Sequence, residues 1–90
     1  MRVTTEDWNN GWHGIEMGIS INEIDYFIKM LKMLKDDPDQ HFHINSDYKA
    51  KDGIGSITFY VKNEKEHDNM EMGSKALLPG EEIPDPKLKK

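Results

Sequence analysis

The stretch SINEIDYFIKMLKMLKDDP, residues 20–38, decides the fold. Ser20 followed three residues later by Glu23 is a capping box, in which the serine oxygen accepts a first-turn backbone N–H and the glutamate accepts the N–H of Ser20. Apolar residues then recur at helical spacing, and Pro38 stops the helix. We therefore expect an amphipathic helix from residue 21 to about residue 35. Its core-facing stripe is predicted to consist of Ile21, Ile24, Phe27, Ile28, Leu31 and Leu34.

Alternation of apolar and polar residues predicts one strand before the helix and two after it. The three segments are residues 12–19, 41–48 and 56–62, and the last of them alternates most clearly. Met70 and Met72 could add a short fourth strand. The expected fold is α+β, with one amphipathic helix packed on one face of a three- or four-stranded, mostly antiparallel sheet. The element order is β-α-β-β, and the helical crossover would allow the first strand to lie parallel to the second.

The ends of the chain differ in composition from this central part. Residues 1–11 are polar and end in the turn signal Asn9-Asn10-Gly11, which predicts an irregular arm. From Pro79 onward three prolines occur in eight residues, which indicates a flexible C-terminal tail over residues 79–90. We therefore expect one α+β domain spanning residues 1–78, because 90 residues leave no room for two cores.

Composition excludes several classes of function. The chain has no cysteine, so disulfides, thiolate nucleophiles and cysteine zinc sites are absent. Its net charge is −5, and the charges of residues 79–90 cancel, so the folded part is acidic and repels nucleic-acid phosphates. Neither a signal peptide nor an apolar run of membrane-spanning length is present, so we expect a cytoplasmic protein that contacts neither nucleic acid nor membrane.

A second apolar stripe, formed by Tyr26, Met30 and Met33, lies beside the core stripe of the helix and widens the apolar arc to about 240°. That arc is wider than a helix packed on one sheet face needs. Two interpretations remain open. In the first, the chain itself covers the stripe, through the segment Ala76-Leu77-Leu78 with Ile83 or through the N-terminal arm. In the second, the stripe is a methionine-rich contact surface for another protein or a dimer seam.

The sheet face opposite the helix is the other candidate surface. His41 and His43 lie two residues apart on one strand, so both imidazoles point to that face and provide half of a zinc site. No third ligand lies at a recognisable metal spacing, which favours solvated histidines and no metal. Aromatic side chains beside carboxylates are also typical of protein interfaces. The residues expected on this face are Trp12, Glu16, His41, His43, Asn45, Asp47, Thr58 and Tyr60, with Asn69 and Glu71 if the strand at residues 70–72 forms.

Nothing in the sequence indicates catalysis. No serine lies in a nucleophile elbow, and the glycines of Gly53-Ile54-Gly55 lead into a strand rather than a helix, so they form no phosphate loop. We therefore expect no enzyme activity, no catalytic residue and no cofactor. The candidate partner-binding residues are Tyr26, Met30, Met33, Trp12, His41, His43 and Tyr60.

The order of elements resembles a known family on the segments 18–25, 27–31, 41–43 and 53–60, which read GISINEID, FIKML, HFH and GIGSITFY. These segments are similar to the small bacterial immunity proteins encoded with polymorphic or contact-dependent toxins. The resemblance implies a cytosolic, non-catalytic protein that neutralises a cognate toxin by covering its active site. It carries over no binding residues. Separately, we expect the chain to be a monomer or a weak homodimer. The alternatives are a small-ligand or metal-binding domain using the face of His41 and His43, and a self-associating structural subunit.

Overall fold

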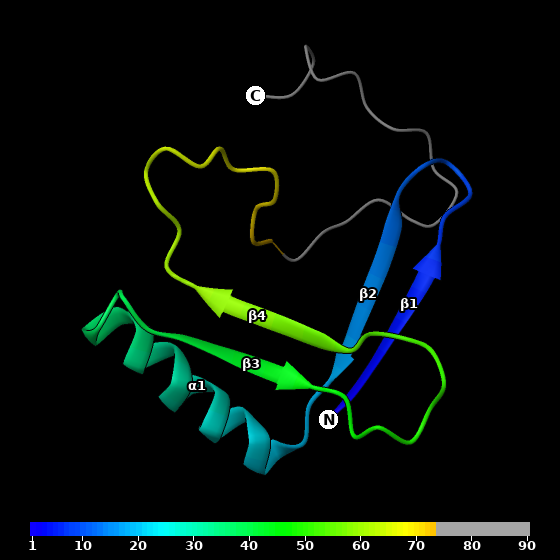
Figure 1. The fold of residues 1–90 in the computed structure, drawn as a ribbon, viewed down its shortest axis with the longest axis horizontal. Coiled ribbons are helices and arrows are strands. Elements are labelled where there is room, and N and C mark those ends of the chain that lie inside the picture. Colours follow the sequence, from blue (N-terminus) through cyan, green and yellow to red (C-terminus); the bar gives the residue numbers. More distant parts are fainter. Residues whose placement is uncertain (74–90) are drawn as a thin grey trace.

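The chain folds into four strands and one helix within residues 1–73, the part that this computed structural model describes (Figure 1). The elements are β1 (Arg2–Asp7), β2 (His13–Gly18), α1 (Ile21–Asp36), β3 (His41–Asn45) and β4 (Ser56–Tyr60). They form two antiparallel two-stranded sheets, β1–β2 and β3–β4, so the predicted α+β class is confirmed. The predicted tail at residues 79–90 and the apolar segment of residues 76–83 lie outside the described residues.

Helix α1 begins as the capping box predicts. The backbone N–H of Glu23 donates to Ser20 Oγ at 3.2 Å, and the N–H of Ser20 donates to Glu23 Oε1 at 3.1 Å. At the other end, the N–H of Asp37 donates to the carbonyl of Met33 at 2.9 Å, and Pro38 follows. Both ends of the helix are therefore set by local sequence.

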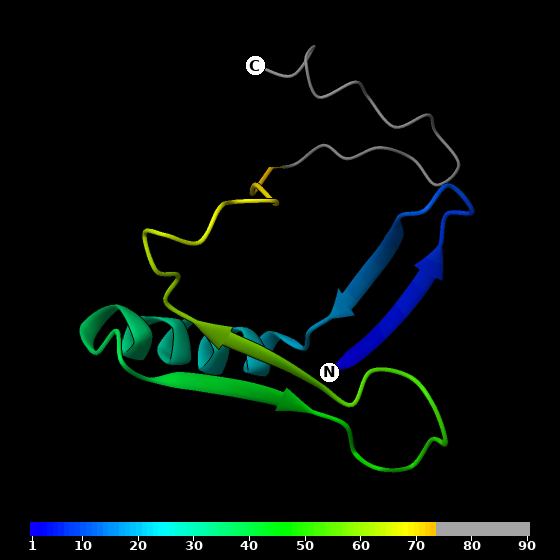
Figure 2. The same cartoon turned by 45° about the horizontal axis from the view of Figure 1, so that its top comes forward.

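Three phenylalanines hold α1 against the β3–β4 sheet. The ring of Phe27 makes edge contacts with Phe42 and Phe59, at centroid distances of 6.0 and 5.3 Å. Phe42 and Phe59 are cross-strand partners and stack at 5.0 Å. Leu34 and Phe42, which are 6% and 7% exposed, are the buried apolar side chains of residues 1–73. The helix thus packs on one face of this sheet, as Figures 1 and 2 show.

The rotation of α1 differs from the predicted core stripe. Phe27 and Leu34 face the sheet, but the other four members of that stripe are exposed, from 43% for Ile24 to 82% for Ile21. The physical reason is the width of the sheet. Two strands about 5 Å apart cover less than the predicted arc of a helix about 10 Å in diameter. The exposed members are Ile21, Ile24, Ile28 and Leu31.

The N-terminal arm predicted for residues 1–11 instead contains strand β1, which pairs with β2 along its whole length. Three consecutive β-branched residues, Val3, Thr4 and Thr5, favour this extended conformation. Asn9 and Gly11 supply the positive φ angles of the connecting turn, 59° and 96°. β1 takes one edge of β2, and β3 does not pair with the other edge, so the expected continuous sheet is instead two separate hairpins.

The remaining strands are shorter than the alternating pattern predicts. β3 ends at Asn45, and β4 ends at Tyr60. Tyr48, expected at the end of β3, lies in the loop between the strands with a φ of 63°, which is incompatible with a strand. The additional strand predicted at Met70 and Met72 does not form. Both side chains are exposed, and in the described part of the chain no strand lies beside this segment to pair with it.

The start of β1 is tied to the start of α1. The amino group of Met1 lies 2.9 Å from Glu23 Oε1, and the same oxygen accepts hydrogen bonds from the N–H and the hydroxyl of Ser20. The hydrogen bond from the amino group is the largest of the contacts that hold the pKa of Glu23 at about 2, below its ordinary value of 4.5. Glu23 therefore links the capping box to the β1–β2 hairpin.

This link predicts a pH-dependent stability. Because the folded-state pKa of Glu23 is lowered, its contribution is complete above pH 4.5 and is lost as the pH falls towards about 2. We expect Glu23→Gln to be less stable than the natural chain at pH 7, and the difference to shrink through that window. Urea unfolding at a series of pH values measures it. Glu16→Gln, on the exposed side of β2, is the control, and a difference that does not change with pH would contradict the assignment.

The rotation of α1 predicts that two leucines of one helix differ in their contribution to stability. Leu34→Ala should cost about 3 kcal/mol of the free energy of unfolding, since Leu34 is buried against the sheet. Leu31→Ala should cost about 1 kcal/mol or less, because Leu31 is 44% exposed. Urea unfolding of the two variants makes the comparison. Equal losses would show that the helix faces the sheet as the sequence pattern predicts.

Candidate functional site

The four exposed members of the predicted core stripe form a continuous apolar line along α1, which we call the aliphatic seam (Ile21, Ile24, Ile28 and Leu31). Their spacings of three, four and three residues place them on one side of the helix, in a line that extends over more than two turns. Exposed apolar side chains that lie singly are normal on a protein surface, but a contiguous line of them is typical of an interaction site. The seam is therefore the first candidate surface.

The second stripe of α1, predicted from Tyr26, Met30 and Met33, is divided by the fold. Tyr26 is exposed, whereas Met30 and Met33 are half-buried. Met33 also lines a shallow depression of about 540 Å³ on the outer side of the helix, together with Ile28 and charged residues such as Lys29. The apolar surface left open on α1 is thus mainly the aliphatic seam, on the side of the helix away from Tyr26.

The outer face of the β3–β4 sheet is the second candidate surface. His41 pairs with Tyr60 and His43 pairs with Thr58, so the four side chains share the face that points away from Phe42 and the helix. All four are exposed. The rings of the two histidines lie 4.9 Å apart, and His43 Nδ1 lies 2.9 Å from Thr58 Oγ1. The pairing of β3 with β4 thus brings His41, His43 and Tyr60 together on one sheet face.

Trp12 does not join this face. It lies in the turn of the β1–β2 hairpin, where its ring is 6.4 Å from that of Trp8. Trp8 covers Gly14, and a Cβ atom at that glycine would lie 2.9 Å from the indole nitrogen, so only glycine fits there. The expectation of one shared face fails because Trp12 and Glu16 belong to the first hairpin and the histidines to the second.

A turn after β4 holds Tyr60 in place. The hydroxyl of Tyr60 donates to Glu66 Oε2, and Glu66 Oε1 accepts the N–H of Asn63 at 3.0 Å. The hydrogen bond from Tyr60 is the main cause that lowers the pKa of Glu66, and the same contact raises the pKa of Tyr60 above its ordinary value of 10.0. Glu66 thus places a negative charge beside the outer face.

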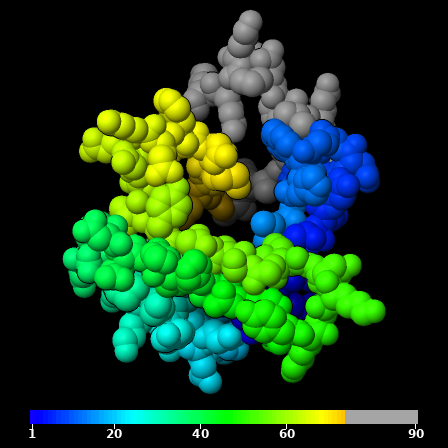
Figure 3. All heavy atoms as spheres, in the orientation of Figure 1, coloured from blue at the N-terminus to red at the C-terminus, as the bar shows by residue number. Residues whose placement is uncertain are grey.

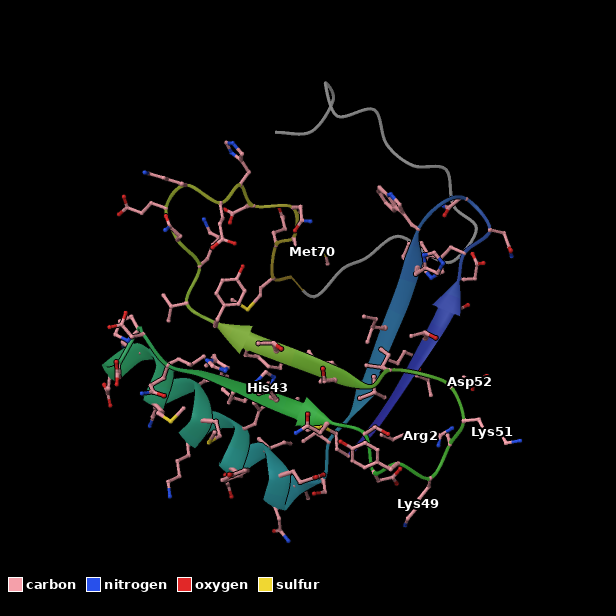
Figure 4. The ribbon with its side chains drawn as sticks, in the orientation of Figure 1. Arg2, His43, Lys49, Lys51, Asp52 and Met70 are labelled. Atoms are coloured by element: carbon pink, nitrogen blue, oxygen red, sulfur yellow. The ribbon has the colours of Figure 1, made fainter. Side chains whose placement is uncertain are left out.

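The loop between β3 and β4 contributes a polar cleft that sequence reasoning missed. The cleft, of about 360 Å³, lies between this loop and the start of β1, and both Arg2 and Asp52 line it. Figure 4 shows Arg2 beside the loop that carries Lys49, Lys51 and Asp52. Tyr48, at the tip, is 87% exposed and has a positive φ, an unusual conformation for an aromatic residue. The sequence pattern did not reveal this position, because Tyr48 continues the alternation of Phe42 and Ile44 and was therefore predicted to be a strand residue.

The β1–β2 hairpin and the described residues after β4 project separately from the unit formed by α1 and the β3–β4 sheet. Figure 3 shows the β1–β2 hairpin in blue and the residues after β4 in yellow on different sides of the molecule. Within residues 1–73, no group of three or more histidines, cysteines or acidic residues is arranged to hold a metal ion. In the same residues no helix has both the length and the apolar character needed to cross a bilayer.

Comparison of the chain with protein-family models, with characterised proteins and with solved structures finds no match.

The contact between Tyr60 and Glu66 predicts a shift that can be measured. In Glu66→Gln the hydrogen bond from the phenol to a carboxylate and the negative charge that opposes its ionisation are both lost, so the pKa of Tyr60 should fall back towards 10. Ultraviolet titration of the phenolate, compared between the two chains, isolates this tyrosine from the other two. Glu64→Gln, in the same turn, is the control. Coincident titration curves for Glu66→Gln and the natural chain would show that the contact does not form in solution.

Proposed function

We propose that the chain is a non-catalytic protein-binding module that uses the aliphatic seam of α1. The observation that carries this proposal is the imbalance between buried and exposed apolar residues. Of the described apolar side chains, only Leu34 and Phe42 are buried, whereas the four seam residues are exposed on one side of one helix. Burying such a line against a partner removes apolar surface from water at about 25 cal/mol per Å². A protein partner offers that cover.

The form of the seam supports recognition of a protein rather than a small molecule. Small-molecule sites are usually concave and enclose most of the ligand. The seam is a convex line of side chains along a helix, and the depression beside it is shallow. A helix side of this kind packs into a groove or against another helix of a partner, with anchors at spacings of three and four residues.

In its specific form, the proposal is that this module is a toxin-neutralising immunity protein of a bacterial polymorphic or contact-dependent system, acting in the cytoplasm. The resemblance on segments 18–25, 27–31, 41–43 and 53–60 supports it. The net charge of −5 is compatible with a basic toxin, since complementary charges speed association. In such a complex the chain would cover the toxin and supply no catalytic group.

Co-expression with the product of the adjacent gene tests this function. We expect that product to inhibit growth when expressed alone, and the present chain to restore growth. Purification of the two products together should then give a stable complex. The immunity function is wrong if the adjacent product is harmless alone or remains toxic in the presence of this chain.

A matched pair of variants tests the seam itself. Ile21→Asp combined with Ile28→Asp places two charges in the seam, and we expect it to lose both complex formation and protection. Asn22→Asp combined with Lys29→Asp introduces the same side chain one residue further along, on the polar side of the helix, and should retain both. Circular dichroism verifies that both chains fold. Equal protection by the two variants would exclude the seam as the binding surface.

The seam spacing also suits a second copy of this chain, which is the alternative of a self-associating subunit. Light scattering at high protein concentration distinguishes the two. A monomeric mass supports the binding of a different protein. A dimeric mass that the Ile21→Asp, Ile28→Asp chain loses supports self-association through the seam and counts against a seam kept free for a toxin.

A further inference from the structure

The outer face of β3–β4 carries two histidines, His41 and His43, whose rings lie close together. His41 and His43 flank the buried Phe42, so strand alternation directs both imidazoles away from the helix. Their ring centres lie 4.9 Å apart, and both side chains are exposed. Figure 4 shows the position of His43 on β3. The pair is independent of the aliphatic seam, which lies on the helix on the other side of the sheet.

The hydroxyl of Thr58 orients one of these imidazoles. Thr58 is the cross-strand partner of His43, and its Oγ1 lies 2.9 Å from His43 Nδ1. In the tautomer in which Nδ1–H donates to Oγ1, the lone pair of Nε2 is free and points away from Thr58. Histidines that bind metals have this arrangement, because an outer hydrogen bond at one nitrogen fixes the ring and leaves the other nitrogen as the ligand.

The separation of the rings fits a shared ion. Zinc lies about 2.0–2.1 Å from an imidazole nitrogen, so two imidazoles at a tetrahedral angle have ring centres roughly 5 Å apart. The observed 4.9 Å agrees with that spacing, and the exposed ring of His41 can turn towards an ion held by His43 without moving the backbone. We propose that His41 and His43 form a two-ligand site for a divalent transition cation of the zinc, copper and nickel class, with Thr58 as the residue that positions His43.

Ligand chemistry and charge support this choice of ion. Neutral imidazole suits zinc, copper and nickel, whereas calcium and magnesium prefer oxygen ligands. The chain carries a net charge of −5, and Tyr60 holds the carboxylate of Glu66 near the same face, so the local potential favours a cation. No third histidine or acidic residue within residues 1–73 completes the set. We therefore expect water in the positions that the described residues leave open, and an ion that exchanges readily.

Calorimetric titration of the untagged, chelator-treated protein with zinc chloride tests the site, with copper chloride as a second probe. The chain has four histidines, which provides a matched control. His41→Ala combined with His43→Ala should abolish binding, whereas His13→Ala combined with His67→Ala should retain the affinity of the natural chain. Copper should bind more tightly than zinc. The proposal is wrong if the first variant binds as well as the natural chain, or if both variants lose binding equally.

Variants of Thr58 test the positioning role. Thr58→Val keeps the shape of the side chain but removes the oxygen, and we expect zinc affinity to fall roughly tenfold, the lower end of the effect of outer-shell substitutions. Thr58→Ser keeps the hydroxyl and should bind like the natural chain. Circular dichroism verifies that each variant folds. Equal affinities of the valine and serine variants would exclude the role of Thr58, and histidine ring signals in NMR that do not shift with zinc would exclude the site.

Discussion

The contact of Phe27 with the stacked pair Phe42 and Phe59 is the interaction on which the rest of the structure depends. It joins the helix to the second hairpin, two elements that neither bury much surface alone nor persist alone in water. Each well-placed aromatic pair contributes about 0.5–1.5 kcal/mol beyond the area it buries. In a domain of this size, with a total stability of a few kcal/mol, three such pairs are a large share of what keeps the fold together.

The same contact sets which side of the helix remains open. Once Phe27 and Leu34 face a sheet of only two strands, the residues about 90° around the helix cannot reach it. Four aliphatic side chains are therefore left in water as the seam. The energetic cost of that exposure is the physical argument for a partner, because covering the seam recovers free energy that the fold alone does not.

The first hairpin is attached to this unit mainly through its end. Glu23 caps the helix and accepts a hydrogen bond from the amino group of Met1, so one carboxylate contacts both the helix and the hairpin. The hairpin has its own local support in the packing of Trp8 over Gly14. Within residues 1–73 no element packs on the outer face of β3–β4, and His41 and His43 remain accessible on it. One helix on one face of the sheet thus leaves the other face as the second candidate surface.

Local sequence determined the elements whose signals act over a few residues. The capping box of Ser20 and Glu23, the stop at Pro38, and the shared face of His41 and His43 all follow from neighbours along the chain. Strand β1 could have been predicted from its β-branched residues, but the polar residues around them favoured an irregular arm.

The tertiary structure alone decided how wide the sheet beneath the helix is, and therefore how α1 is rotated. Helical periodicity places apolar residues on an arc but does not say which part of the arc meets a sheet, so Leu34 and Leu31 are equivalent in the pattern and different in the fold. Whether β2 also pairs with β3 is the second such decision, because β1 takes only one of the two edges of β2 and the local sequence does not determine what lies at the other. The candidate surfaces depend on both decisions, because exposure is a property of the packed molecule.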